Sequence, residues 1–236
     1  MRHAKRAMLY SGLFAALVVA GMLWYGVSKQ ARAPLAGPIR SVGTAEVAPD
    51  TSRLMPPEEP GVSLFLDAEH DLLLKYPSSI APLRDREAMG RLGYIPVCDP
   101  YHALVCFPYD PPAYEDTNFG SSAFAINLRA DMETEAECLA AQPAEDARGA
   151  VLLGETVFSS FSFADAAMSH RLDGWNYRAF REGGCYELTT RVLSSAYEVW
   201  EPGAIREFTL ADEAAVRLEL EKMLKSFRFQ ADLELL

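Results

Sequence analysis

The chain has 236 residues and a formal net charge of −11, and 50% of its residues are hydrophobic. With 11% aromatic residues as well, it can bury a real core, which excludes wholesale disorder. Residues 1–32 hold five basic and no acidic residues, so the remainder carries 17 basic against 33 acidic residues, a formal charge of −16. Such a surface repels phosphate backbones, so we expect no nucleic-acid partner.

An uncharged apolar run occupies residues 7–27. As a helix it spans about 30 Å, the thickness of the hydrocarbon core of a bilayer. Tyr10 lies near one end of the run and Trp24 and Tyr25 near the other, where aromatic rings favour the membrane interface. The basic stub at residues 1–6 favours a cytoplasmic N-terminus. The sequence therefore predicts a single-pass anchor in a bacterial inner membrane, with everything after it exported to the periplasm.

A cleaved signal peptide is the alternative for this run. Signal peptides have apolar cores of about 7 to 15 residues followed by a small-x-small site. Residues 31–33 (Ala-Arg-Ala) offer that site, but Pro34 would directly follow the cut and the run is longer than a typical core. We therefore expect a signal-anchor that is not cleaved, and either alternative exports the rest of the chain.

A proline-rich segment follows at residues 28–61. Its six prolines and lack of periodicity are typical of a semi-extended linker. The folded domain is then predicted over residues 62–236, a length that fits one domain.

Short apolar or alternating runs predict that this domain is mainly β-structure. Residues 62–67 and 71–76 form a predicted hairpin, and the period-two pattern at 122–129 is typical of a half-buried strand. Further strands are predicted at 157–163, 175–181 and 185–193, with the turn between the last two at Gly183-Gly184.

Helices are fewer. A short one is predicted at residues 133–141, and a longer one begins after Thr209, whose spacing from Asp212 resembles a capping box. Apolar residues from Val216 to Phe227 recur on one face of this C-terminal helix. The expected fold class is α+β: a mainly antiparallel sheet covered by the C-terminal helix, behind one N-terminal transmembrane helix.

Two segments of this domain resemble the PsbP/Mog1-like α/β/α sandwich superfamily. Residues 71–80 are similar to its opening strand followed by Tyr-Pro-Ser, and residues 221–229 are similar to its final helix and strand. The resemblance covers fewer than 25 residues, mostly core and turn positions, and the middle of the chain with its cysteines departs from the pattern. It implies a sandwich fold, and members of the superfamily serve as photosystem accessory subunits, small-GTPase binders and secreted proteins. No catalytic residue is implied, because the matched positions carry none.

Four cysteines lie beyond the predicted anchor: Cys98, Cys106, Cys138 and Cys185. An even number in an exported domain favours two disulfides, and of the three pairings we expect Cys98–Cys106 and Cys138–Cys185. A zinc site or a catalytic cysteine is less favoured, because no Cys-x-x-Cys is present and a lone nucleophile would leave three cysteines unexplained. We expect no metal and no cofactor.

The candidate catalytic residues are few. His70 is expected in a solvated turn, whereas His102 and His170 are candidates for a general base if a carboxylate lies beside them in space. The motifs of serine hydrolases, P-loops, zinc proteases and dinucleotide-binding folds are all missing from the sequence. We therefore expect a domain that is not an enzyme.

Aromatic residues beside arginines suggest a partner surface. We place it at Trp175, Tyr177, Arg178 and Tyr186, although core or sheet-surface positions are the more common explanation for such aromatics. The favoured hypothesis is a membrane-anchored periplasmic binding or accessory domain with an envelope component as partner. The alternatives are a small hydrolase that uses His102 or His170 with a carboxylate, and a structural spacer domain.

Overall fold

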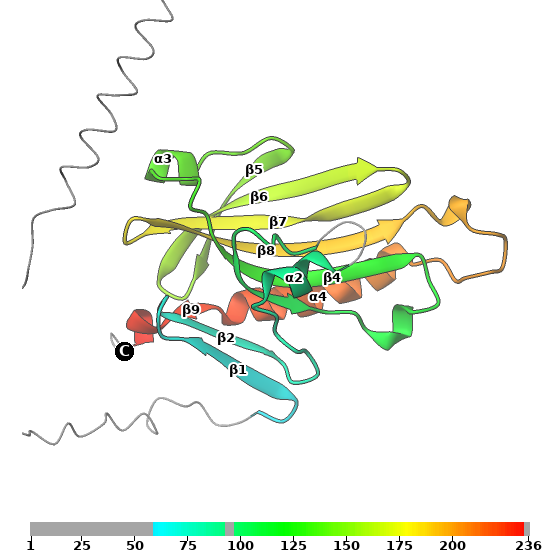
Figure 1. The fold of residues 1–236 in the computed structure, drawn as a ribbon, viewed down its shortest axis with the longest axis horizontal. Helices are drawn as coiled ribbons and strands as arrows, with labels where there is room; N and C mark the ends of the chain where they lie inside the picture. The colour runs from blue at the N-terminus through cyan, green and yellow to red at the C-terminus, as the bar shows by residue number, and fades with distance from the viewer. Residues whose placement is uncertain (1–58, 93–96, 234–236) are drawn as a thin grey trace, which may run out of the picture. The chain divides into compact units, whose positions relative to one another are not determined.

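The computed structural model describes residues 59–92 and 97–233 (Figure 1). The predicted anchor at residues 7–27 and nearly all of the linker at 28–61 lie outside these residues. Within the part of the chain that is described, no helix is both long and apolar enough to cross a membrane.

Most of the domain is one six-stranded antiparallel sheet, with the strand order β3-β4-β8-β7-β6-β5. Its strands are β3 (Ala103–Pro108), β4 (Phe119–Leu128), β5 (Glu145–Leu153), β6 (Thr156–Ala167), β7 (His170–Arg181) and β8 (Gly184–Ser195). The predicted α+β class with a mainly antiparallel sheet is confirmed for the described residues.

A smaller sheet has the order β1-β2-β9, built from β1 (Val62–Asp67), β2 (Leu72–Pro77) and β9 (Arg228–Phe229). The hairpin predicted at 62–76 is present as β1 and β2. Strand β9 directly follows the C-terminal helix α4 (Leu210–Ser226), so the end of the chain pairs with the start of the domain.

The main hydrophobic core lies between one face of the large sheet and the layer formed by α4 and the small sheet (Figure 1). Helix α4 is capped as predicted, because Thr209 and Asp212 form a reciprocal capping box. Its buried residues Val216, Leu220 and Leu224 recur at helical spacing and pack into this core.

The opposite face of the large sheet, called the second face below, is also covered. Helix α2 (Arg86–Gly90) and the segment after residue 96 pack on it beside β3, and α3 (Glu135–Cys138) packs on it near the start of β8. The strand expected at 122–129 is therefore not half-buried: Ala123, Ala125 and Asn127 on its polar side are as buried as Phe124 and Ile126. The alternation assigned the faces correctly, but it gave no information about what covers each face.

Two tight turns join the long central strands. In the turn from β7 to β8, Glu182 and Gly183 both have positive φ, so the turn lies one residue earlier than Gly183-Gly184 and Gly184 pairs with Arg181. The turn from β6 to β7 uses Met168 and Ser169, also at positive φ. Positive φ at both central residues matches the twist of a two-residue hairpin.

Short 3-10 turns complete the chain: η2 (Pro112–Tyr114), η3 (Tyr197–Val199) and η4 (Gln230–Leu233).

Candidate functional site

Three neighbouring strands place polar side chains opposite one another on the second face. Asn127 on β4 pairs with Glu187 on β8, which in turn pairs with Arg178 on β7. Residues opposite each other in antiparallel strands project their side chains to the same side. The three residues therefore form one buried polar row, in which Asn127 is 1% exposed and Arg178 is fully buried.

The carboxylate of Glu187 is the centre of this row. It accepts hydrogen bonds from Arg178 Nε at 2.6 Å, from Arg129 Nη1 at 3.2 Å and from Asn127 Nδ2 at 3.4 Å. Arg178 also pairs with Glu145 at the start of β5. Two carboxylates therefore neutralise one fully buried guanidinium, as a buried charge requires.

The network continues through Glu145 to Asn176 and Arg191. Asn176 Nδ2 donates to the carboxylate of Glu145, and Arg191 donates to Asn176 Oδ1 and to the carbonyl of Trp175. Burial alone raises the pKa of Glu145, but hydrogen bonds from Arg178, the Gln142 N–H and Asn176 hold it below its ordinary value. Burial lowers the pKa of Arg191 to about 10.

Gly174 makes room for the guanidinium of Arg191. A side chain at Gly174 would place Cβ 1.8 Å from the carbonyl oxygen of Thr190 and 3.1 Å from Arg191 Nη1. The guanidinium lies 4.4 Å from the ring centroid of Phe163, a cation–π contact. Because Gly174 has no side chain, β7 and β8 can approach each other here. The guanidinium of Arg191 then has room to lie against the ring of Phe163.

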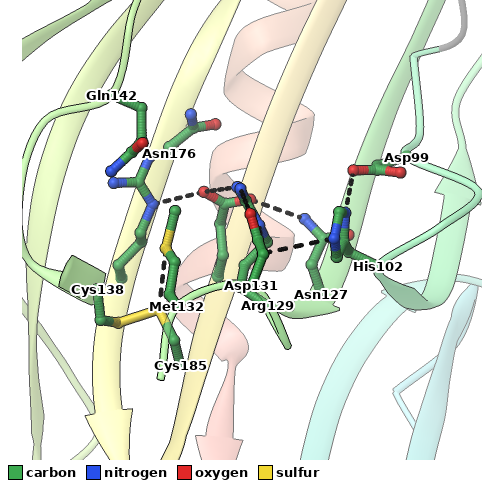
Figure 2. Close-up of polar contacts among 12 residues, drawn as sticks. Asp99, His102, Asn127, Arg129, Asp131, Met132, Cys138, Gln142, Asn176 and Cys185 are labelled. Carbon is green, nitrogen blue, oxygen red and sulfur yellow. Dashed lines mark hydrogen bonds and ion pairs between the residues drawn. A yellow bond between two sulfur atoms is a disulfide. The ribbon is translucent and has the colours of Figure 1, made fainter. Parts of the chain in front are cut away.

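At its other end the network reaches His102. The Nδ1 atom of His102 lies 2.6 Å from Asp99 Oδ2, and Nε2 lies 3.4 Å from Asp131 Oδ1. Asp131 also pairs with Arg129, whose hydrogen bond is the main reason that the pKa of Asp131 falls to about 2. Both ring nitrogens of His102 therefore face carboxylates (Figure 2).

A cavity of about 760 Å³ lies above the network. This volume is typical of small-molecule sites. Its floor is polar and consists of Asn127, Arg129, Asn176, Glu187, Thr189 and Arg191.

Two walls of the cavity are held by the two disulfides. One wall is residues 97–101, which are bonded to β3 through Cys98–Cys106. The other contains Gln142 and Pro143, which follow α3, and α3 is bonded to β8 through Cys138–Cys185. Both disulfides have the pairing expected from the sequence. Each ties one wall of the cavity to the sheet that forms its floor.

One atom of the cavity floor has no partner. Asn127 Oδ1 is buried and makes no hydrogen bond to any described residue. Its orientation is fixed, because Nδ2 faces the carboxylate of Glu187, which only accepts. A buried acceptor without a donor costs about 1 to 3 kcal/mol, so a donor that reached this atom would offset that cost.

The four residues of the predicted partner surface do not lie together. Trp175 and Tyr177 stack on the α4 side of the sheet and are partly exposed, beside Arg217. Arg178 is fully buried in the network on the second face, and Tyr186 is 9% exposed within the main core. Burial removes Arg178 and Tyr186 from any free surface, and a partner contact at Trp175 and Tyr177 stays a prediction.

The candidate histidines are scattered. His70 lies in the turn between β1 and β2, and its Nδ1 atom is 3.2 Å from Asp67 Oδ1. His170 is the first residue of β7. Only His102 lies near the network. Asn127, Arg129 and Glu187 were missed, although the first two alternate on the polar side of one predicted strand and Glu187 lies within another.

The charged side chains of the network are engaged with one another. Among residues 59–92 and 97–233, no cluster of His, Cys, Asp and Glu side chains has the geometry of a metal site. The carboxylates of Glu145 and Glu187 are occupied by arginines, so neither is available as a general base. What the cavity offers is fixed donors and acceptors around one unsatisfied oxygen.

No family model and no curated protein matches the sequence. Among solved structures, LpqN of Mycobacterium tuberculosis, described as involved in cell envelope biogenesis, aligns over 72% of this chain and 84% of its own length. The identity is 10% and the TM-score is 0.32. This degree of likeness assigns neither a family nor a function to the chain, and membership of the PsbP/Mog1-like superfamily stays a prediction.

Proposed function

We propose that the chain is an exported, non-catalytic binding domain whose ligand occupies the cavity above Asn127, Glu187 and Thr189. In this proposal, residues 7–27 hold the domain at the outer face of a bacterial inner membrane. The linker at 28–61 sets its distance from the membrane, and the partner is a component of the envelope.

The unpaired oxygen of Asn127 is the observation that carries the proposal. Every neighbouring charged group in the floor has partners from the chain itself, whereas this acceptor has none within the described residues. A ligand that donates a hydrogen bond to Oδ1 offsets its desolvation, which is the usual reason that such atoms persist in binding sites.

The disulfides support export. Stable disulfides form in oxidising compartments such as the periplasm and are rare in the cytosol. Among the described residues no cysteine is free, because all four are paired. This agrees with the topology that the basic stub and the apolar run predict.

A hydrolase that uses His102 is the alternative, and the contact with Asp99 at 2.6 Å favours it. Against it, Asp131 faces the second ring nitrogen, and His102 is not among the residues that line the cavity. A general base needs a nitrogen that can accept a proton from a substrate or a water. A spacer domain, the other alternative, needs no cavity with a polar floor.

The test is equilibrium dialysis of the full-length chain, purified in detergent with its disulfides intact. The radiolabelled probes are maltose, cellobiose, N,N′-diacetylchitobiose, glycine, succinate, inorganic phosphate and putrescine. Gly90 lines the cavity, and a Cβ added there meets no atom within 4 Å, so Gly90→Trp introduces bulk without disturbing the floor. Gly90→Ala is the matched control.

We expect at least one probe to bind the wild type and Gly90→Ala, and to bind Gly90→Trp at least tenfold more weakly. If no probe binds, or if Gly90→Trp binds as Gly90→Ala does, the cavity is not the binding site.

A further inference from the structure

We infer that the ligand of this cavity is a neutral saccharide of one to three rings; this rests on the proposed function and names its ligand class. The charge of the lining, its hydrogen-bonding groups and its apolar patches each point to this class.

Most charges of the lining are already compensated. Glu187 contacts Arg129 and Glu145 contacts Arg178, whereas Asp99 contacts His102, which is charged only when protonated. An anionic ligand would lose its hydration without gaining a free counter-charge from Arg129, which is strongly unfavourable.

Arg191 is the exception, and it does not act as an anion receptor. Its Nη1 donates to the carbonyls of Trp175 and Thr190, and its Nη2 donates to Asn176 Oδ1. One face of its guanidinium is covered by the ring of Phe163. The planar fork that would grip a carboxylate or a phosphate is therefore directed at the chain itself.

The polar groups of the floor alternate between donor and acceptor. Asn127 offers a free acceptor, and Thr189 offers a hydroxyl that both donates and accepts. Arg129 and Glu187 place a guanidinium beside a carboxylate. A sugar hydroxyl both donates and accepts, so neighbouring hydroxyls on one ring match such a pattern. A hydrocarbon ligand would bury Asn127 Oδ1 without a donor.

Apolar side chains complete the lining. Phe163 and Leu172 lie at one side of the cavity, and Tyr101 lines it with 77% of its surface exposed. An aromatic ring that remains exposed beside a polar cavity can cover an apolar ligand face. A pyranose ring has hydroxyls around its edge and C–H groups on its faces, so it can contact the floor and Tyr101 together.

The test extends the dialysis panel to two further variants of the full-length chain. Asn127→Leu keeps the size of the side chain but removes the free acceptor, and Tyr101→Ala removes the exposed ring. Asn118→Leu is not a suitable control, because Asn118 holds the backbone of Ser195 and Phe208. Leu152→Ala, at an exposed position on β5 outside the cavity, controls for purification and folding.

We expect one of the three neutral disaccharides to bind more tightly than succinate, phosphate, putrescine and glycine. Asn127→Leu should weaken that binding at least tenfold, Tyr101→Ala several-fold, and Leu152→Ala not at all. If a charged probe binds best and Gly90→Trp abolishes it, the cavity is a binding site but the saccharide class is wrong. If no probe binds, both proposals fail.

Discussion

The guanidinium of Arg178 on β7 donates a hydrogen bond of 2.6 Å to the carboxylate of Glu187 on β8, and the two side chains are 0% and 5% exposed. This pair lies at the middle of a polar network that crosses the second face from His102 to Arg191. It explains how a sheet that is covered on both sides keeps a polar cavity: its charges neutralise one another inside the protein.

Replacing Arg178 by methionine should destabilise the domain by about 3 to 5 kcal/mol, because Glu145 then stays buried without its cation and Glu187 keeps only Arg129. Urea unfolding followed by tryptophan fluorescence measures the loss. Arg148→Met on β5 is the control. The side chains of Arg148 and its partner Asp146 are 52% and 78% exposed, so its loss should cost at most about 1 kcal/mol. Equal losses in the two variants would show that the network does not stabilise the fold.

Gly174→Ala should destabilise the domain by at least about 1 to 3 kcal/mol, because the added Cβ would lie 1.8 Å from the carbonyl oxygen of Thr190. The melting temperature of the variant measures this. Gly90→Ala, with no atom within 4 Å of its Cβ, should have the same melting temperature as the wild type. A Gly174→Ala variant as stable as Gly90→Ala would mean that β7 and β8 do not approach each other as described.

The two disulfides should contribute unequally. By the loop-entropy relation, Cys138–Cys185 with a separation of 47 residues is worth about 4 kcal/mol, and Cys98–Cys106 with a separation of 8 about 2.5 kcal/mol. Unfolding of the two double-alanine variants in urea compares them. A larger loss for Cys98→Ala with Cys106→Ala would contradict the entropic account and would indicate that this bridge acts through the folded state.

Stability should fall as the pH drops from about 4 to about 2. The hydrogen bond from Arg129 lowers the pKa of Asp131 to about 2, below the value of about 3.9 in an unfolded chain. The unfolded chain therefore binds the proton first, so the stabilisation is present above pH 4 and is lost below it. The side chain of Asp131 is 50% exposed, which reduces the size of the effect.

The measurement is the free energy of unfolding at several pH values between 2 and 5. Asp131→Asn should give a shallower slope of unfolding free energy against pH than the wild type. Asp146→Asn should keep the wild-type slope, because the side chain of Asp146 is 78% exposed. Identical slopes for all three proteins would remove Asp131 as a source of acid sensitivity.

The sequence predicted the elements whose signals are local. The hairpin at 62–76, the capped helix after Thr209 and the long strands each follow from patterns within about ten residues. Strand β5 was missed because its first residues, Glu145 to Arg148, are charged or small, and its partner strand was needed to identify it. The β6–β7 turn was missed because Met168 and Ser169 are not typical residues for positive φ.

The candidate site could not be predicted in the same way. Arg129, Glu145 and Glu187 come from three segments, and only the register of the strands from β4 through β8, β7 and β6 to β5 brings them to one place. The disulfide pairing was predictable because four cysteines allow only three pairings, and Cys98 and Cys106 lie close together in the sequence. The burial of Arg178 was not predictable, because an arginine between aromatic residues has the same sequence pattern on an exposed surface as in a buried network.

The side-chain amide of Asn127 gives the most direct test of the central claim that the cavity binds a ligand. With the full-length chain labelled with nitrogen-15 in detergent, the amide resonances of Asn127 can be assigned by comparison with Asn127→Leu. Titration with the disaccharide that binds best should shift these resonances with the same Kd that dialysis gives. Resonances of Asn127 that stay unchanged at saturation, while others move, would place the ligand elsewhere and contradict the account.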